Sequence, residues 1–295
     1  MRPFQGLMWM VASTLAMVGV NGTVKHLGTD IPAAQAAFLR FVIGVPFFLP
    51  MVLPILRAQY PRLVWRLFLG RAAMHAVAVI LWFYAMARVP VADMAAIGFL
   101  NPVVVLVIGG LIIGEGLPLR RVALALLACL GALIILRPGL REVTAGHMAQ
   151  MGATFCFAAS YIVVKRLSQL VPAGVTVAML TFTMTLVLFP LALAVWQPVT
   201  PVQMLWLALA AGLATLGHYA MSRAFAAAPL AVTQPAGFLQ LIWATLLGIL
   251  AFGERFDLWV LMGGAVILGA FCVNTLAETR RRGAAVAAPE AMPPL

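Results

Sequence analysis

The most informative polar side chains lie inside long apolar runs, where a protein rarely places them without a reason. Arg71, His75 and Trp82 follow one another at helical spacing, so they share one face of a helix over residues 67–87. Because such a basic-to-aromatic stripe is costly in lipid, we expect it to point into the protein interior. It could form a cavity wall with a basic entrance and an aromatic contact for a solute. Alternatively, His75 is a hydrogen-bonded structural histidine.

Other apolar runs also carry polar or aromatic residues. Asn101 and Gln240 occupy equivalent positions when the chain is shifted by 139 residues, and a pair of amides suits recognition of a zwitterion. The alternative is that these amides form hydrogen bonds between helices, which contribute less than about 2 kcal/mol each in membranes. The remaining candidates for contact with a solute are Asn21, Phe99, Tyr161, His218, Tyr219, Phe238 and Trp243.

Catalytic and metal-binding patterns are absent from the sequence. It contains no zinc-protease, Gly-x-Ser-x-Gly or Walker motif, so we expect neither an enzyme nor direct use of ATP. The three cysteines lack metal-ligand spacing, and we predict no metal and no other cofactor. No acidic residue lies deep inside an apolar run, which argues against proton coupling through a buried carboxylate. Only His75 and His218 could titrate there near neutral pH.

The composition indicates that a membrane surrounds these residues. Hydrophobic residues make up 64% of the 295 residues and charged residues only 9%, whereas soluble domains are about half apolar and about a quarter charged. Ten apolar runs approach the roughly 20 residues that cross a bilayer, and none alternates like a barrel strand. They cover residues 6–24, 33–56, 67–87, 92–113, 119–136, 148–164, 175–196, 202–222, 231–252 and 258–276. We therefore predict an all-α integral membrane protein with ten transmembrane helices.

The chain also contains an internal repeat. Between Ala85–Glu115 and Ala224–Glu254, 11 of 31 positions are identical, where composition alone would give roughly two or three. The repeat predicts two five-helix units, residues 1–140 and 141–280, followed by a disordered cytoplasmic tail at 281–295. A repeated unit with an odd number of spans enters the membrane from the opposite side. Inverted repeats around a central site are typical of secondary transporters.

Both halves carry a shared pattern of Ala, Pro, Gly-Phe-Leu and Gly-Glu, at Ala85–Ala92 with Gly114-Glu115 and at Ala224–Ala231 with Gly253-Glu254. In this pattern the sequence resembles the EamA-type members of the drug/metabolite transporter superfamily, and among them the aromatic and neutral amino-acid exporters. The resemblance extends over about residues 6–276. It implies a central cavity lined mainly by spans 1, 3, 4, 6, 8 and 9, with spans 5 and 10 at the periphery.

Some residues of the repeated runs could move during transport. Glycine frees the backbone and proline bends a helix, so the hinge candidates are Gly98, Pro102, Pro235 and Gly237. Static kinks are the alternative. Glu115 and Glu254 end their runs beside basic residues, where each could latch a gate or only anchor a helix end. Lys25 is expected to extend outward to the interface.

The distribution of basic residues predicts the orientation. If the N-terminus is cytoplasmic, 13 Lys and Arg fall on the cytoplasmic side and 5 outside. The positive-inside rule thus places both termini in the cytoplasm of a bacterial-type inner membrane. Since the basic residues are scattered through short loops, topology explains the net charge of +11 and no nucleic acid is expected as a partner.

These features predict a secondary transporter that works by alternating access, as a monomer or weak homodimer in a lipid bilayer. We expect its small-molecule substrates to be neutral metabolites, amino acids including aromatic ones, exported by facilitated diffusion or exchange. The alternative is a proton-coupled exporter or importer of another metabolite or drug, such as a nucleoside or a vitamin. A membrane-embedded enzyme would need a clustered catalytic set, and a channel would need a continuous polar pore.

Overall fold

The computed structural model describes residues 3–101, 103–104, 108, 119–137, 142–167, 170–227 and 239–287. These residues form ten helices and no strand, which confirms the all-α prediction. The helices are α1 (Pro3–Leu27), α2 (Ala33–Arg57), α3 (Arg62–Met86), α4 (Val91–Gly98), α6 (Leu119–Leu136), α7 (Ala145–Leu167), α8 (Ala173–Ala194), α9 (Pro201–Ala227), α11 (Leu239–Phe252) and α12 (Leu258–Ala287). By length and composition, α1, α2, α3, α8 and α9 each contain a stretch that can cross a membrane.

Proline determines where several of these helices begin. Pro32, Pro61, Pro90 and Pro172 each stand immediately before the first residue of a helix. The proline ring fixes φ and removes an N–H that a helix start would leave without an intrahelical partner. The apolar runs are therefore separated at the prolines, as the sequence predicts.

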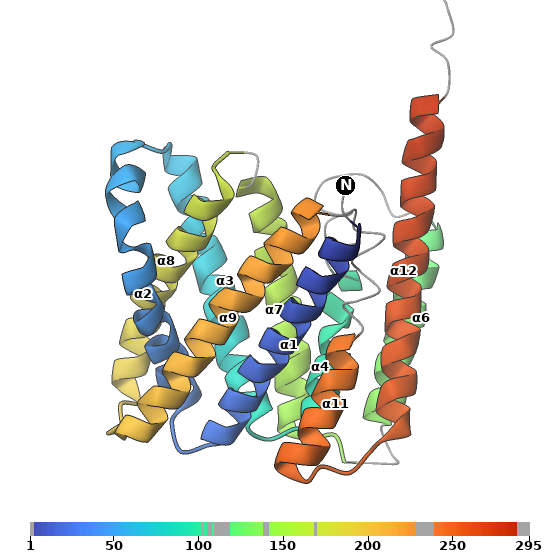
Figure 1. The fold of residues 1–295 in the computed structure, drawn as a ribbon, viewed down its shortest axis with the longest axis horizontal. Coiled ribbons are helices and arrows are strands. Elements are labelled where there is room, and N and C mark those ends of the chain that lie inside the picture. The colour runs from blue at the N-terminus through green and yellow to red at the C-terminus, as the bar shows by residue number, and fades with distance from the viewer. Residues whose placement is uncertain are drawn as a thin grey trace, which may run out of the picture.

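Equivalent helices of the two halves run in opposite directions. In Figure 1, α2 runs from bottom to top and α8 from top to bottom, while α3 runs downward and α9 upward. The most extensive packing joins α1 with α9, α3 with α7, α2 with α8, and α6 with α12. The repeat relates α1 to α7, α2 to α8, α3 to α9 and α6 to α12. A two-fold axis that exchanges the halves therefore converts the α1–α9 pair into the α7–α3 pair and maps the α2–α8 and α6–α12 pairs onto themselves. The fold is thus the one expected of inverted five-helix repeats.

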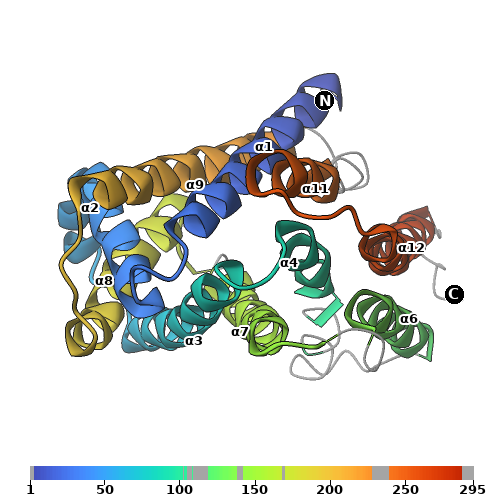
Figure 2. The same ribbon diagram turned by 90° about the horizontal axis from the view of Figure 1, so that it is seen from below.

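The helices α6 and α12 form the edge of the bundle, where spans 5 and 10 were expected (Figure 2). Their crossing is reciprocal at two glycines. A Cβ atom at Gly131 would lie 2.7 Å from the carbonyl oxygen of Gly263, and one at Gly263 would lie 2.5 Å from that of Gly131. Gly131 also faces Ile267, one turn after Gly263, and Gly263 faces Ile135, one turn after Gly131. Small residues let the two backbones approach this closely.

Two boundaries differ from the prediction. Helix α12 continues to Ala287, so residues 281–287 are helical and not part of a disordered tail. The alanines in this stretch have high helix propensity. In the run expected over 92–113, α4 ends at Gly98 and a turn follows at Phe99, whose N–H donates to the carbonyl of Ala96.

Candidate functional site

A cavity of about 360 Å³ lies among α2, α3, α8 and α9. Its volume is within the roughly 300–1,000 Å³ typical of small-molecule sites. On α2 the lining residues are Arg40, Gly44 and Phe48, which recur at intervals of about one turn and therefore share one face of the helix. The other lining residues are Phe41, His75, Gly174, Val177, Leu180, Thr181, Ala211, Ala214, Thr215, His218 and Tyr219.

The cavity extends toward one side of the bundle. We call the side at which α1 begins, the top of Figure 1, the N-face, and the opposite side the far face. Gly174 is the second residue of α8, which starts at the N-face. Phe48 is also nearer the N-face than Arg40, because α2 runs toward that face and rises roughly 12 Å over eight residues. Arg40 thus lies at the deeper end of the cavity.

Two histidines contribute polar groups to the cavity. The Nδ1 atom of His75 lies 3.2 Å from the hydroxyl oxygen of Ser160, and the His75 ring packs edge-on against Phe157 of α7. His75 therefore ties α3 to α7 and lines the cavity at the same time. His218 lines it from α9. The next residue, Tyr219, accepts a hydrogen bond of 3.1 Å from Arg223 at its hydroxyl.

Two arginines make this region strongly basic. Arg40 lines the cavity, and its guanidinium lies 5.3 Å from the centre of the Phe41 ring. Arg71 of α3 is only 6% exposed and donates to the carbonyl of Thr176 at 3.0 Å. Both arginines are within electrostatic range of His75 and His218. None of the described acidic side chains lines the cavity.

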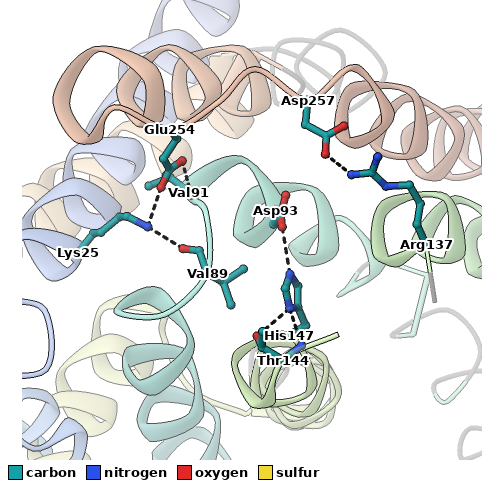
Figure 3. A network of polar contacts seen from close by, with 9 residues as sticks. All are labelled: Lys25, Val89, Val91, Asp93, Arg137, Thr144, His147, Glu254 and Asp257. Carbon is teal, nitrogen blue, oxygen red and sulfur yellow. Dashed lines mark hydrogen bonds and ion pairs between the residues drawn. The ribbon is translucent and has the colours of Figure 1, made fainter. Parts of the chain in front are cut away.

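The far face carries a polar network, shown in Figure 3, around a second cavity of about 440 Å³. The ammonium of Lys25 lies 2.6 Å from Glu254 Oε1 and donates to the carbonyl of Val89 at 2.7 Å. Glu254 also accepts the N–H of Val91, the first residue of α4, at 3.0 Å. A carboxylate at this position satisfies a free N–H of the helix start and complements its dipole. Glu254 therefore joins α1, α4 and the end of α11.

A His–Asp hydrogen bond and a second ion pair belong to the same network. His147 Nε2 lies 3.1 Å from Asp93 Oδ2, and both side chains are buried. Because the N–H of Thr144 donates to His147 Nδ1, the Nε2 atom carries the proton toward Asp93. Arg137, after α6, pairs with Asp257, just before α12 (Figure 3). Each of the three pairs joins a residue of the first half of the chain to one of the second.

The cavity brings together three of the residues expected to contact a solute, namely His75, His218 and Tyr219. The other described candidates lie outside its lining. Asn101 donates to the carbonyl of Thr154 at 3.2 Å, which is the interhelical bond considered as an alternative. Asn21 is buried in α1, and Tyr161 is exposed on α7. Trp82, Phe99 and Trp243 pack against the main hydrophobic core, and Gln240 is partly buried on α11.

The hinge candidates are described only in part. Gly98 is the last residue of α4, and a Cβ there would lie 3.7 Å from Gln150 Nε2, an ordinary contact. The described residues do not include Pro102, Pro235, Gly237, Phe238 and Glu115.

Three features differ from the sequence analysis. Of the helices expected to line the cavity only α3 and α9 do so, together with α2 and α8, whereas α1, α4, α7 and α11 supply no lining residue; α1, α4 and α11 pack against one another instead. Lys25 does not extend outward, since a carboxylate from the other half of the chain neutralises it. Arg40 and His147 were not singled out, although a lone arginine in an apolar run is itself a signal of function.

Comparison with known proteins agrees with this architecture. The model of the EamA-like transporter family matches residues 4–137 and 144–276. A riboflavin transporter of Rhizobium johnstonii is 30% identical over 288 residues, covering 95% of this chain and 94% of the relative. A riboflavin transporter of Vibrio cholerae is 28% identical, with 95% and 96% covered. The pseudopaline exporter of Pseudomonas aeruginosa (strain UCBPP-PA14) is 25% identical, with 94% and 97% covered.

A solved crystal structure shares the fold, with a TM-score of 0.59 and 19% identity over 94% of this chain and 96% of that one. The two matched segments correspond to the two halves found by the internal repeat. The protein is therefore a ten-helix, multi-pass membrane protein that belongs to the EamA-like transporter family.

Proposed function

We propose that the protein carries small organic metabolites by alternating access and that the cavity is its substrate site. One observation carries this proposal. A cavity directed toward the N-face coexists with a far face at which two ion pairs and the His147–Asp93 hydrogen bond join the halves. This arrangement supports a carrier that takes up solute from the N-face while its far face is held together.

The two halves, residues 1–140 and 141–280, are the units that would move. The two ion pairs and the His147–Asp93 hydrogen bond all join one half to the other, so separating the halves at the far face breaks them together. The end of α4 at Gly98 is a suitable bending point, since the helix is interrupted by the turn at Phe99. Equivalent bending at Pro102, Pro235 and Gly237 stays a prediction. Substrate then reaches the cavity alternately from the two sides.

The positive-inside rule assigns the N-face to the cytoplasm and the far face to the outside. In this assignment the described state is open to the cytoplasm, as a carrier must be when it loads a solute for export. Both termini would then be cytoplasmic.

Riboflavin is the first substrate candidate, because two relatives that match nearly the whole chain are named riboflavin transporters. The cavity offers Phe41, Phe48 and Tyr219 to a planar ring system. Export of aromatic amino acids is the second candidate. It is favoured by the same aromatic side chains together with Arg40, which can pair with a carboxylate.

The test is counterflow into proteoliposomes that contain the purified full chain and unlabelled solute. Radiolabelled riboflavin and L-phenylalanine are offered outside in separate experiments. Saturable uptake of at least one supports the proposal, and uptake of neither contradicts it for these substrates.

A cavity-filling variant locates the site in the same assay. Gly44 lines the cavity, so Gly44→Phe should lower the uptake rate at least tenfold. The matched control is Gly70→Phe, because a Cβ at Gly70 of α3 meets no atom within 4 Å. Equal rates in the two variants would place the substrate site elsewhere.

A further inference from the structure

The deep end of the cavity presents a cation without a protein counter-ion. Arg40 is partly buried and lines the cavity, where its guanidinium lies over the ring of Phe41 and pairs with none of the described carboxylates. A guanidinium on an otherwise apolar cavity wall is stabilised by an anion that enters the cavity. Arg40 can therefore receive an anionic group from a bound solute.

Arg71 adds a second incompletely satisfied guanidinium nearby. One of its terminal nitrogens donates to the carbonyl of Thr176, but its Nε atom is buried and has no partner among the described residues. The side chain is 94% buried, as its exposed fraction of 6% implies. Two guanidinium groups thus add positive charge to one region of the site.

The acidic residues whose side chains the structure describes lie at the opposite side of the molecule. Glu254, Asp257 and Asp93 are all engaged in the far-face network. Asp30 and Glu142 lie in the connections at the far face, between α1 and α2 and between α6 and α7. The electrostatic field inside the cavity is consequently set by arginine, and low-dielectric walls strengthen it.

Resting on the proposed function of the cavity as the substrate site, we infer that it selects solutes carrying an oxyanion, a carboxylate or a phosphate, bound at Arg40. The planar fork of a guanidinium matches the oxygens of either group. Phe41 and Phe48 line the cavity beside Arg40, and Tyr219 lines it from α9, so the rest of the solute is aromatic or apolar. The class is therefore an aromatic solute with one acidic group, which favours the second substrate candidate, an aromatic amino acid, over riboflavin, which carries no such group.

The experiment compares solutes that differ only in this group. Two pairs are used as probes: L-phenylalanine with L-phenylalaninamide, and riboflavin 5′-phosphate with riboflavin. Affinity is measured by ligand-dependent thermal stabilisation of the purified full chain, and flux by counterflow in proteoliposomes. Binding is thereby read independently of transport.

The variants are Arg40→Gln, which removes the charge, and Arg40→Lys, which keeps it. Arg66→Gln is the matched control, because Arg66 is an exposed arginine at the start of α3. We expect the acidic member of at least one pair to bind ten times or more tightly than its neutral partner. Arg40→Gln should remove that difference, Arg40→Lys should retain most of it, and Arg66→Gln should leave it unchanged. Preference for phenylalanine identifies the carboxylate, and preference for the phosphate ester identifies the phosphate.

The other outcomes separate the two proposals. Equal affinity within both pairs, or a preference that survives in Arg40→Gln, overturns the inference. If riboflavin is carried at an unchanged rate by Arg40→Gln, the transport function stands and the inference fails. Charge-dependent binding without any flux leaves the inference standing and contradicts the proposed function for these solutes. Absence of both binding and flux overturns both.

Discussion

Lys25 of α1 and Glu254, which follows α11, form an ion pair of 2.6 Å between the two halves of the chain. Their side chains are 16% and 13% exposed, so the pair is shielded more than a surface salt bridge. The same carboxylate accepts the N–H of Val91 at the start of α4. In this geometry Glu254, of the Gly-Glu element in the second half, holds α1, α4 and the end of α11 together at the far face.

Removing the charge of Glu254 should loosen that face. For Glu254→Gln we expect a loss of about 1–2 kcal/mol in the stability of the closed state, which corresponds to about a 5–30-fold rise in the open population. Thr245 lines the pocket at the far face, so a cysteine there reports opening through its rate of maleimide labelling. The measurement uses a Thr245→Cys background from which Cys129, Cys156 and Cys272 have been removed.

The matched control for this variant is Glu142→Gln, which removes an exposed carboxylate from a far-face connection. Its labelling rate should stay at the parental value. Lys25→Met should act like Glu254→Gln, and combining the two should add little, because both break one interaction. Fully additive effects would show that Lys25 and Glu254 act independently.

Gly248 of α11 offers a second way to disturb the same carboxylate. A Cβ at this position would collide with the Glu254 side chain, and the Glu254 N–H donates to the Gly248 carbonyl at 2.9 Å. Gly248→Ala should therefore raise the maleimide labelling rate of the cysteine at position 245, as Glu254→Gln does. In the control Gly212→Ala, nothing lies within 4 Å of the added carbon, so labelling should not change. A Gly248→Ala variant that labels like the parent would mean that Glu254 can shift without opening the face.

The crossing of α6 and α12 should govern stability and not selectivity. At Gly131 and Gly263 an added Cβ meets backbone atoms of the facing helix, which cannot rotate away as a side chain can. We expect Gly131→Ala and Gly263→Ala each to lower the free energy of unfolding by about 1–3 kcal/mol. Thermal unfolding in detergent measures this, with Gly269→Ala as control because its Cβ would meet no atom within 4 Å. The apparent affinity for solute should stay constant, since neither glycine lines the cavity; a changed affinity would contradict the peripheral role.

The sequence predicted the helices well because their signals are local. An apolar run and a proline before it, as at Pro61 and Pro90, determine a helix and its start without reference to the rest of the chain. Helical spacing likewise placed His75 on an interior face, and the cavity includes it.

Contacts between distant segments could not be found in this way. Asp93 and His147 are 54 positions apart, and the sequence offers no rule that pairs a carboxylate in the first turn of one helix with a histidine in the first turn of another. Arg40 was visible as a charge within an apolar run, yet its direction depends on how α2 packs against α8 and α9. Equivalence under the repeat singled out Asn101, which bonds to the backbone of α7 and lies outside the lining of the described cavity, so its contact with a solute stays a prediction.

The unpaired charge of Arg40 also predicts the mode of transport. When the cavity is empty, closing the N-face would bury this guanidinium without a counter-ion, at a cost of several kcal/mol. A bound anionic solute neutralises it, so the loaded carrier should change sides faster than the empty one. Because about 1.4 kcal/mol corresponds to a tenfold change in rate, exchange should exceed net efflux by at least about tenfold.

This difference is measured as efflux of radiolabelled solute from proteoliposomes into buffer with and without unlabelled solute outside. Arg40→Gln should bring the two rates together by accelerating the return of the empty carrier, even if it weakens binding. Arg66→Gln should preserve the difference. Equal rates in the parent protein would indicate facilitated diffusion. Efflux that requires a pH gradient would instead indicate proton coupling, and His75 and His218, which line the cavity, would then be the residues to substitute first.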